Sequence, residues 1–260
     1  MKVLVIDIGG NSVKVLVTGE TDPRKFPSGP KLTPRQMVSA VLKLTEDWKC
    51  DAVSIGYPGR VRDGRPVSEP YNLGRGWVKF DYAAAFGRPV KVMNDAAMQA
   101  LGSYKSGTML FLGLGTGLGT AMVVEGTMVP MELGHLSYKQ GTYEDYLGLK
   151  GLERLGIKKW RACFREVVTR FITALELDEV VIGGGNVNKL DKLPPSCRAG
   201  DNALAFRGGV LLWEEDGRQK TRARSKASSR PSRKDRQAVT AKKKAVSSRN
   251  TTSTNGRMPL

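Results

Sequence analysis

The sequence predicts an α/β fold made of two related halves. Apolar runs at Met109–Leu112 and Ala121–Val124 are typical of strands, and four glycines lie between them. The same layout occurs near the N-terminus, where the pair Gly9–Gly10 separates apolar runs at 3–8 and 13–18. Candidate strands and helices alternate after each hairpin, which indicates an α/β protein.

The glycines of both hairpin turns are suited to binding phosphate. Glycine has no Cβ, so backbone N–H groups there can turn toward an anion and approach it closely. One such turn in each half suggests a single phosphate-bearing ligand held between them. Two ordinary hairpins with glycine turns remain the alternative on this pattern alone.

Capping residues and apolar spacing predict the remaining elements of the first half. Thr33 and Pro34 are expected to start a helix as its N-cap and first residue. The proline- and glycine-rich segment 23–30 and residues 60–88 are expected as connections, with an exposed loop at 72–77. The expected helices and strands that follow the hairpin are 34–48, 51–56, 89–93 and 96–104.

The second half repeats this scheme in a shorter form. A strand is expected over 179–182, just before three glycines, and a closing helix over 201–213, which Gly208 and Gly209 weaken. Between the second hairpin and that strand, a long helix is expected over 158–177. Its apolar face contains Trp160, Phe164, Val167, Phe171, Ile172 and Leu175.

Positive charge is concentrated in the last part of the chain. The formal net charge is +17, and residues 218–260 contain fourteen Lys and Arg against one acid, which leaves only +4 for residues 1–217. The segment has almost no large apolar residue, which predicts disorder. A run this basic can bind polyphosphate or nucleic acid electrostatically, and a solubilising tail is the alternative.

Cysteine usage and hydropathy narrow the class of protein. Cys50, Cys163 and Cys197 are far apart and form no CxxC pair, so neither a disulfide framework nor a zinc knuckle is indicated. No apolar run approaches the roughly 20 residues that a membrane-spanning helix needs, and the N-terminus lacks the pattern of a signal peptide. These observations predict a cytoplasmic protein with reduced thiols.

Asn94 and Asp95 lie where a strand is expected to end and a helix to begin, a common position for ligand-binding residues in α/β proteins. Asp95 could act as a general base that accepts a hydroxyl proton while that oxygen attacks a phosphoryl group. Asn and Asp are also favoured helix caps, so capping alone is the alternative.

Glu132 and His135 form a second candidate pair, and His135 is the only histidine in the chain. A single histidine excludes a multi-histidine zinc site, and paired Glu-x-x-His metal sites need a second copy that the chain lacks. A carboxylate beside an imidazole suits vicinal hydroxyls, which can donate to the carboxylate and accept from the ring N–H. A purely structural histidine is the alternative.

Asp7 and Lys14 flank the first glycine turn. Asp7 could hold Mg²⁺ through a water, since Mg²⁺ keeps several waters and uses one or two carboxylates together with phosphates. Lys14 could reach a phosphate, and the three glycines at 183–185 could let a nucleotide approach the backbone. A solvated hairpin end and a plain glycine turn are the respective alternatives.

Seven stretches, in the same order, resemble the ROK family of sugar kinases and repressors, within the actin-like ATPase superfamily. Together they span nearly all of residues 3–213. The stretches are DIGGNSVK (7–14), IGYPGRV (55–61), the loop at Asn72, NDAAMQALG (94–102), LGLGTGLGTA (112–121), ELGH (132–135) and VVIGGG (180–185). Within the family, the chain is most similar to the short bacterial polyphosphate/ATP-dependent glucokinases.

The resemblance implies two RNase H-like α/β domains that close over a cleft. They would comprise residues 1–107 and 108–216, with the last helix packed back on the first domain and a disordered basic tail at 217–260. It also implies a hexose kinase in which Asp95 is the catalytic base for the 6-hydroxyl of glucose. Mg²⁺ would assist, and ATP or inorganic polyphosphate would be the phosphoryl donor.

The resemblance also assigns binding roles by position. The implied sugar-binding residues are Asn72, Asn94, Glu132, His135 and Glu144. The implied phosphate- or nucleotide-binding residues are Asp7, Gly9, Gly10, Asn11, Lys14, Gly115, Thr116, Gly117, Gly183, Gly184 and Gly185. A homodimer is a further implication of the family.

Some features depart from the family pattern. The residues after His135 contain no cysteine where many members have a zinc cluster, so no zinc site is expected. The short second half leaves ATP and polyphosphate open as donors. The first hairpin begins at Val3 without a preceding helix-turn-helix, which argues against a repressor. A non-catalytic sugar sensor, or a polyanion-binding protein that uses the basic tail, is the competing hypothesis.

Overall fold

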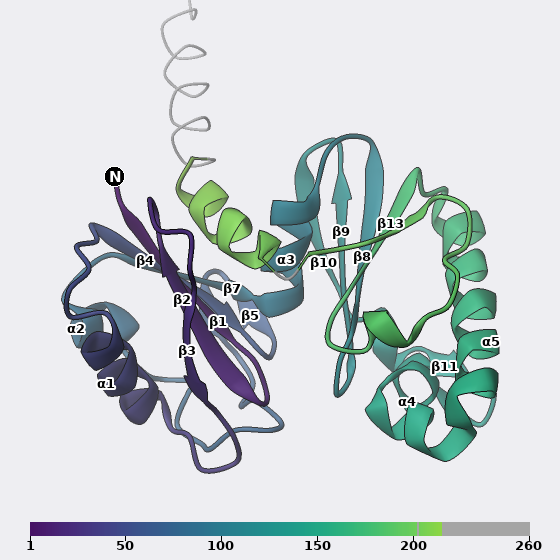
Figure 1. The fold of residues 1–260 in the computed structure, drawn as a ribbon, viewed down its shortest axis with the longest axis horizontal. Helices are drawn as coiled ribbons and strands as arrows, with labels where there is room; N and C mark the ends of the chain where they lie inside the picture. Colours follow the sequence, from purple (N-terminus) through teal and green to yellow (C-terminus); the bar gives the residue numbers. More distant parts are fainter. Residues whose placement is uncertain (202, 215–260) are drawn as a thin grey trace, which may run out of the picture. The chain divides into compact units, whose positions relative to one another are not determined.

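Two five-stranded sheets form the framework of the chain, whose computed structural model describes residues 1–201 and 203–214 (Figure 1). The first sheet has the order β3-β2-β1-β4-β7. Its strands are β1 (Val3–Ile8), β2 (Ser12–Val17), β3 (Arg24–Pro27), β4 (Ala52–Tyr57) and β7 (Val90–Asn94). The second sheet has the order β10-β9-β8-β13-β14. Its strands are β8 (Thr108–Leu114), β9 (Leu118–Val124), β10 (Thr127–Met131), β13 (Glu179–Gly183) and β14 (Cys197–Ala199).

The two sheets have the same topology, which confirms the predicted duplication. In each, a first strand pairs antiparallel with a second, and the second pairs antiparallel with a third. The first strand also pairs in parallel with a fourth, which pairs in parallel with a fifth. Thus β1 corresponds to β8 and β4 to β13.

Helices and two small hairpins connect the strands. The helices are α1 (Pro34–Leu44), α2 (Tyr82–Phe86), α3 (Asp95–Ser103), α4 (Tyr143–Leu147) and α5 (Leu149–Leu175), and residues 204–214 form a further helix. The hairpins are β5 (Val61–Arg62) with β6 (Arg65–Pro66) and β11 (Ser137–Tyr138) with β12 (Gly141–Thr142). Short 3₁₀ helices cover Leu133–His135 and Val187–Lys189. None of these described helices is long and apolar enough to cross a membrane.

Each sheet buries one face under its own helices. Ile6, Ile8 and Val13 pack with α1 in the first core, while alternate residues Val3 and Val5 face the other way. In the second sheet, the side chains of β8 alternate in the same manner between α5 and α3. This alternation is the period-two pattern of a strand buried on both faces, and it leaves α3 between the two sheets.

Glycines allow the helix at 204–214 to cross α3 at very short range. A Cβ at Gly102 would overlap the carbonyl of Leu204, and one at Gly208 would overlap the carbonyl of Met98. A Cβ at Gly209 would overlap the Val5 side chain beneath. The closing helix is confirmed, and the glycines that weaken its pattern in the sequence are those that let it pack on α3 and β1. The proposed domain boundary near residue 107 stays a prediction, because residues 1–213 form one compact unit.

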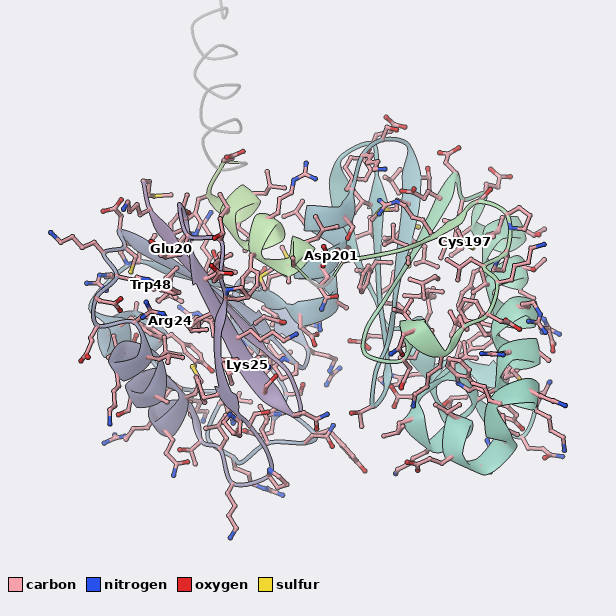
Figure 2. All side chains as sticks on the ribbon, viewed as in Figure 1. Glu20, Arg24, Lys25, Trp48, Cys197 and Asp201 are labelled. Atoms are coloured by element: carbon pink, nitrogen blue, oxygen red, sulfur yellow. The ribbon has the colours of Figure 1, made fainter. Side chains whose placement is uncertain are left out.

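The predicted connection at 23–30 is wrong, since β3 lies within it. Phe26 packs against the core on the α1 side, and Arg24 lies over the Trp48 ring at 4.0 Å from its centroid (Figure 2). These contacts hold a short edge strand whose last residue is Pro27, a residue tolerated at an edge. A strand of four residues is too short to show a clear alternation of apolar and polar residues in the sequence.

The region 60–88 is also more ordered than the sequence suggests. It contains the β5–β6 hairpin and α2, and the loop at 72–77 is not simply exposed. Trp77 is completely buried in the first core, and its ring N–H donates to the Gly74 carbonyl at 2.8 Å. The buried tryptophan anchors this loop, and so fixes the backbone around Asn72.

Two predicted helix boundaries need correction. α1 begins at Pro34 with the expected Thr33 capping box, but it ends at Leu44, before Trp48. α5 consists of two helical segments separated by a kink at Gly156, whose φ of 73° is not helical. The second segment begins after this kink, close to the predicted start at 158, and it ends at Leu175 rather than 177. The predicted tail at 217–260 lies outside the described residues.

Candidate functional site

The two glycine turns face each other. A Cβ built on Gly10 would lie 3.9 Å from Oγ1 of Thr116 and 3.8 Å from the Asn72 amide nitrogen. The backbone N–H groups of Gly10, Asn11, Thr116 and Gly117 have no acceptor among the described residues. Unpaired N–H groups on opposed turns are what an anion-binding site requires. The structure therefore brings together the phosphate-binding turns predicted from the two halves.

Asn94 caps α3 and also reaches toward the first half. Its Oδ1 accepts a hydrogen bond from the Ala97 N–H at 3.0 Å, and its Nδ2 donates to the Gly59 carbonyl at 3.1 Å. The capping interpretation is thus confirmed for this residue, and one N–H of its amide remains for a ligand. The Asn72 amide makes no hydrogen bond within the described part of the chain.

Asp95 follows at the first turn of α3, where its Oδ1 accepts from the Ala96 N–H at 2.8 Å. Burial is the largest cause that raises the pKa of the Asp95 carboxyl to about 7, and the charges of Asp7 and Glu132 raise it further. Backbone N–H groups at the start of the helix oppose this rise. The result is a carboxyl that changes its protonation near neutral pH.

Asp7 is the other buried carboxylate of the site, with 8% of its surface exposed. Burial raises its pKa, and the ammonium of Lys14 offsets part of that rise. The two residues are directly opposite one another on β1 and β2. Asp7 has no hydrogen-bond partner for its carboxylate among the described side chains.

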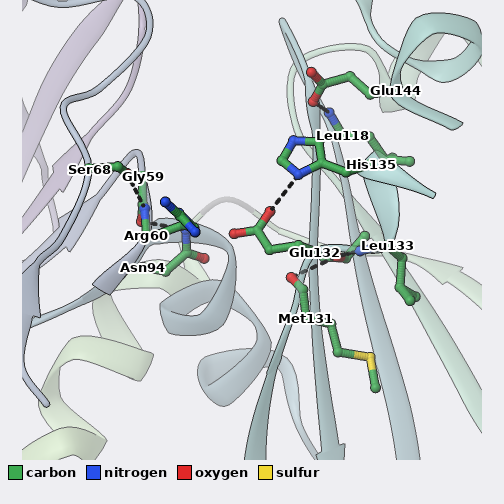
Figure 3. A network of polar contacts seen from close by, with 11 residues as sticks. Gly59, Arg60, Ser68, Asn94, Leu118, Met131, Glu132, Leu133, His135 and Glu144 are labelled. Atoms are coloured by element: carbon green, nitrogen blue, oxygen red, sulfur yellow. Dashed lines mark hydrogen bonds and ion pairs between the residues drawn. The ribbon is translucent and has the colours of Figure 1, made fainter. Parts of the chain in front are cut away.

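A cavity of about 490 Å³ lies beside Asn94 and Glu132. The segment 60–63 and Val67 line one side, and Thr120 and Met131 line the other. Figure 3 shows Arg60 and Asn94 facing Glu132 across this space. The cavity thus has room for a small polar molecule next to the helix that carries Asp95.

Glu132 and His135 occupy the 3₁₀ turn after β10, which is held by the Thr120 hydroxyl. That hydroxyl donates to the Met131 carbonyl at 2.9 Å and accepts from the Leu133 N–H at 3.0 Å. His135 Nδ1 is 3.9 Å from Glu132 Oε2, and the two side chains are 66% and 51% exposed. Both side chains are therefore accessible from outside, and the roles predicted for Glu132 and His135 stay predictions.

Glu144 lies beside the second glycine turn, at the start of α4. Its Oε2 accepts from the Leu118 N–H at 2.8 Å (Figure 3). A Cβ at Gly117 would overlap this carboxylate, so the glycine is required for the close approach. Glu144 therefore helps to shape the phosphate turn, and its second oxygen is left for a ligand.

The three glycines after β13 play different parts. Gly183 has the Phe111 ring where a side chain would be, and Gly184 has a φ of +87° with the Leu114 backbone against it. Gly185 alone faces open space. The triple-glycine turn therefore packs tightly on β8 and exposes only its last member.

Asn186 is a residue that the sequence reasoning missed. It is 8% exposed, its N–H donates to the Leu114 carbonyl at 3.0 Å, and its Nδ2 donates to the Gly115 carbonyl at 3.1 Å. These bonds tie the triple-glycine turn to the phosphate turn. An asparagine directly after three glycines is the only signal for this role in the sequence.

The donor set around Asp7 is compatible with Mg²⁺ and a phosphate ligand. No group of three or more metal-ligating side chains occurs among the described residues, so a metal caged by the protein alone is not indicated there. One buried carboxylate without a hydrogen-bond partner, on the strand that leads into the first of the two opposed glycine turns, suits a cation that takes most ligands from water and phosphate. The expectation of no zinc site stays a prediction.

Curated proteins similar to this chain include two mycobacterial polyphosphate glucokinases. The chain is 27% identical over 213 residues to polyphosphate glucokinase of Mycobacterium tuberculosis (strain CDC 1551 / Oshkosh), covering 73% of this chain and 80% of that protein. It is 26% identical over 212 residues to polyphosphate glucokinase of Mycobacterium leprae, covering 73% of this chain and 65% of that protein.

Solved structures share the fold. The inorganic polyphosphate/ATP-glucomannokinase of Arthrobacter sp. strain KM superposes with a TM-score of 0.71 at 23% identity, covering 81% of this chain and 97% of that one. A ROK family glucokinase of Streptomyces griseus, solved with glucose and AMPPNP, gives 0.66 at 19% identity, covering 82% and 99%. The ROK family model matches residues 3–142, more than half of the chain. The protein belongs to the ROK family.

Proposed function

We propose that the protein is a hexose kinase that transfers a phosphoryl group from ATP or polyphosphate to the 6-hydroxyl of a sugar, with glucose as the expected acceptor. One observation carries this proposal: Asp95, with a carboxyl pKa raised to about 7, directly follows Asn94, which lines a cavity, and its pKa responds to the charge of Asp7 beside one of two opposed glycine turns. Phosphoryl transfer asks a protein mainly for positioning, charge neutralisation and one base near the nucleophile.

Asp95 is the general base in this proposal. A base acts best when its pKa is near the working pH, because it is then largely deprotonated and still accepts a proton readily. The ionised Asp95 accepts the proton of the sugar 6-hydroxyl as that oxygen attacks the terminal phosphorus of the donor. The bond from this phosphorus to the bridging oxygen breaks, and ADP or a polyphosphate shorter by one phosphate leaves. The backbone N–H groups that contact its carboxylate hold it in place at the start of α3.

Five polar side chains around the cavity and the second glycine turn bind the sugar hydroxyls. They are Asn72, Asn94, Glu132, His135 and Glu144. The carboxylates accept from hydroxyls, and the amides and the imidazole both donate and accept. Asn94 and Glu132 line the cavity, and Asp95 directly follows Asn94 in the chain, which favours an acceptor hydroxyl close to the base.

The donor phosphates bind between the opposed turns. The unpaired N–H groups of Gly10, Asn11, Thr116 and Gly117, together with Lys14, supply the positive field, and Gly9 and Gly115 shape the turns. Gly185, at the open end of the triple-glycine turn, borders the part of the donor beyond these phosphates. Mg²⁺, held by Asp7 and the phosphates, would neutralise part of the donor charge when bound.

The test is a phosphorylation assay of the full chain with glucose and Mg²⁺, run in parallel with ATP and with polyphosphate. Formation of glucose 6-phosphate with either donor supports the proposal and identifies the donor. Absence of product with both donors and a panel of hexoses, while glucose still binds in calorimetry, would contradict the kinase and favour a sugar-binding protein.

The basic tail supports a second, separate proposal, polyanion binding. Residues 218–260 carry a formal charge of +13 by sequence, enough for salt-dependent attraction to polyphosphate or nucleic acid. Truncation after Glu215 should then weaken retention on a polyanion column and make it less sensitive to salt. Unchanged retention would leave the tail without this role.

A further inference from the structure

A row of charged residues crosses the first sheet next to the site. The strand register places Lys14 directly opposite Asp7, and Lys25 directly opposite Lys14. Residues that are directly opposite in neighbouring strands project from the same face of a sheet. Asp7, Lys14 and Lys25 therefore share one face, from the centre of the sheet to its β3 edge.

That face is the one on which α3 packs. Val3 and Val5, which alternate with the α1-facing residues of β1, belong to one buried cluster with Met98 of α3 and with Ala205 and Phe206 of the helix at 204–214. Asp7 continues the series of Val3 and Val5 along β1. On β3, Phe26 points to the α1 side, so its neighbour Lys25 points to the opposite side. The row thus begins at the buried carboxylate that lies near Asp95 and leads outward.

β3 is fixed to the first glycine turn. The Ser28 hydroxyl donates to the Gly9 carbonyl at 2.6 Å, and the Ser28 N–H donates to the Asn11 carbonyl at 3.1 Å. Lys25 (labelled in Figure 2) is exposed, and it forms no ion pair or hydrogen bond within the described residues. The Lys25 ammonium is therefore available to a ligand, on a strand that is fixed to the first glycine turn.

Two lysines directly opposite one another repel, and like charges in this position destabilise a strand pair. Lys14 has Asp7 on its other side, but no acid compensates Lys25 in the described chain. A bound anion that spans both ammonium groups would remove the repulsion. Neighbouring strands are only about 4.8 Å apart, so one chain of linked phosphates can contact both.

We propose that Lys25, next to Lys14, extends the phosphate site at the glycine turns into a subsite for a linear polyphosphate donor. The inference rests on the proposed function, because the reacting end of the chain is placed at those turns. A nucleotide carries a sugar and base after its three phosphates, whereas polyphosphate carries charge along its whole length. Lys25 therefore favours the longer, purely anionic donor.

The alternative role for Lys25 is protection of an edge. Lysine on an edge strand discourages pairing with another chain, without any ligand. That role predicts a change in oligomeric state or aggregation when the charge is removed, and no change in donor kinetics.

The experiment compares Lys25→Gln with Lys43→Gln in the full chain. Lys43 is exposed on α1, which covers the opposite face of the sheet, so it controls for the loss of one positive charge. Binding of polyphosphate of increasing length, and of ATP, is measured by calorimetry, with kcat/KM for each donor and the thermal midpoint Tm.

We expect Lys25→Gln to weaken polyphosphate binding by roughly fivefold, with a smaller loss for ATP and a loss that grows with chain length up to the span of the subsite. Tm should stay the same or rise slightly, because a repulsion is removed. Lys43→Gln should change neither the binding of the two donors nor Tm. Equal losses for both donors, equal effects of the two variants, or no loss for polyphosphate would overturn the inference.

The binding measurement separates this inference from the kinase proposal. If the wild-type chain binds polyphosphate through Lys25 but forms no sugar phosphate, the kinase fails and the subsite stands. If the chain phosphorylates glucose from ATP and polyphosphate does not bind, the kinase stands and the subsite is wrong.

Discussion

The charge of Asp7 raises the pKa of the Asp95 carboxyl, although the two residues come from different elements of the fold. Asp7 is the last but one residue of the buried strand β1, and Asp95 begins α3 after β7. Burial is the larger cause of the shift, and Asp7 is the next. The pair places a carboxyl that titrates near neutral pH close to a buried carboxylate that has no hydrogen-bond partner among the described residues.

The first prediction concerns the pH dependence of catalysis. Because the base acts in its ionised form, kcat/KM should rise with pH through about 7 and level off above it. Asp7→Asn removes a negative charge, so the rising limb should shift to lower pH in addition to any loss of rate. Initial rates between pH 5 and 9 at a constant ionic strength provide the measurement. A limb that keeps its midpoint in Asp7→Asn would contradict the coupling.

The second prediction concerns stability. The folded-state pKa of Asp95 is above its ordinary value, so between about pH 4 and 7 the folded chain keeps a proton that the unfolded chain releases. This stabilisation is therefore lost as pH rises through that window. The asparagine in Asp95→Asn does not titrate. The free energy of unfolding of this variant, relative to wild type, should therefore be about 2–3 kcal/mol higher at pH 8 than at pH 5.

Urea unfolding without ligands at both pH values measures this gain. Asp22→Asn, which alters an exposed carboxylate between β2 and β3, is the matched control and should show no such change with pH. A pH-independent difference between Asp95→Asn and wild type would show that Asp95 is not a destabilised carboxylate.

The third prediction concerns a cluster that supports Glu144. Glu166 accepts from the Tyr138 hydroxyl at 2.8 Å and lies 3.3 Å from the Lys139 ammonium. The Tyr138 ring contacts the rings of Tyr143 and Tyr146, which flank Glu144 in α4, with centroids 5.0 and 4.9 Å apart. The cluster thus fixes α4 relative to α5.

Glu166→Gln should therefore raise KM for the sugar by a few-fold and lower stability by about 1 kcal/mol, while the pH midpoint of the rate stays the same. Glu153→Gln, at an exposed position of α5, is the control and should change none of these. An unchanged sugar KM in Glu166→Gln would remove the positioning role.

The fourth prediction concerns the crossing of α3 and the helix at 204–214. Gly102→Ala and Gly208→Ala each place a methyl group against the backbone of the facing helix. Each should therefore lower the free energy of unfolding by about 1–3 kcal/mol. The double variant should cost less than the sum, because the first methyl already separates the helices. Thermal unfolding of the three variants tests this, and additive effects would contradict a shared contact.

The sequence predicted what local rules determine. The two hairpins, the Thr33 cap and the strand–helix junction at Asn94–Asp95 follow from apolar periodicity, glycine turns and capping, and each is present. The edge strand β3 has only four residues, too few to show an alternating apolar pattern. It forms because Phe26 packs against the first core.

Other parts of the site depend on contacts between distant segments. The burial of Trp77, the bonds of Asn186 to β8 and the effect of Asp7 on Asp95 join residues far apart in the chain. No local pattern encodes such contacts. Gly208 and Gly209 also could not be interpreted from local sequence. Glycine disfavours a helix by its own propensity, but at these positions only glycine lets the helix pack closely on α3 and β1.

The most direct test of the account is Asp95→Asn, assayed with glucose and Mg²⁺ and the donor that supports wild-type turnover, together with glucose calorimetry. Asparagine keeps the shape of the side chain and cannot accept the hydroxyl proton as a base. The account predicts that kcat falls by about 10²–10⁴-fold while the glucose dissociation constant changes little. Near wild-type turnover in Asp95→Asn would contradict the assignment of Asp95 as the base.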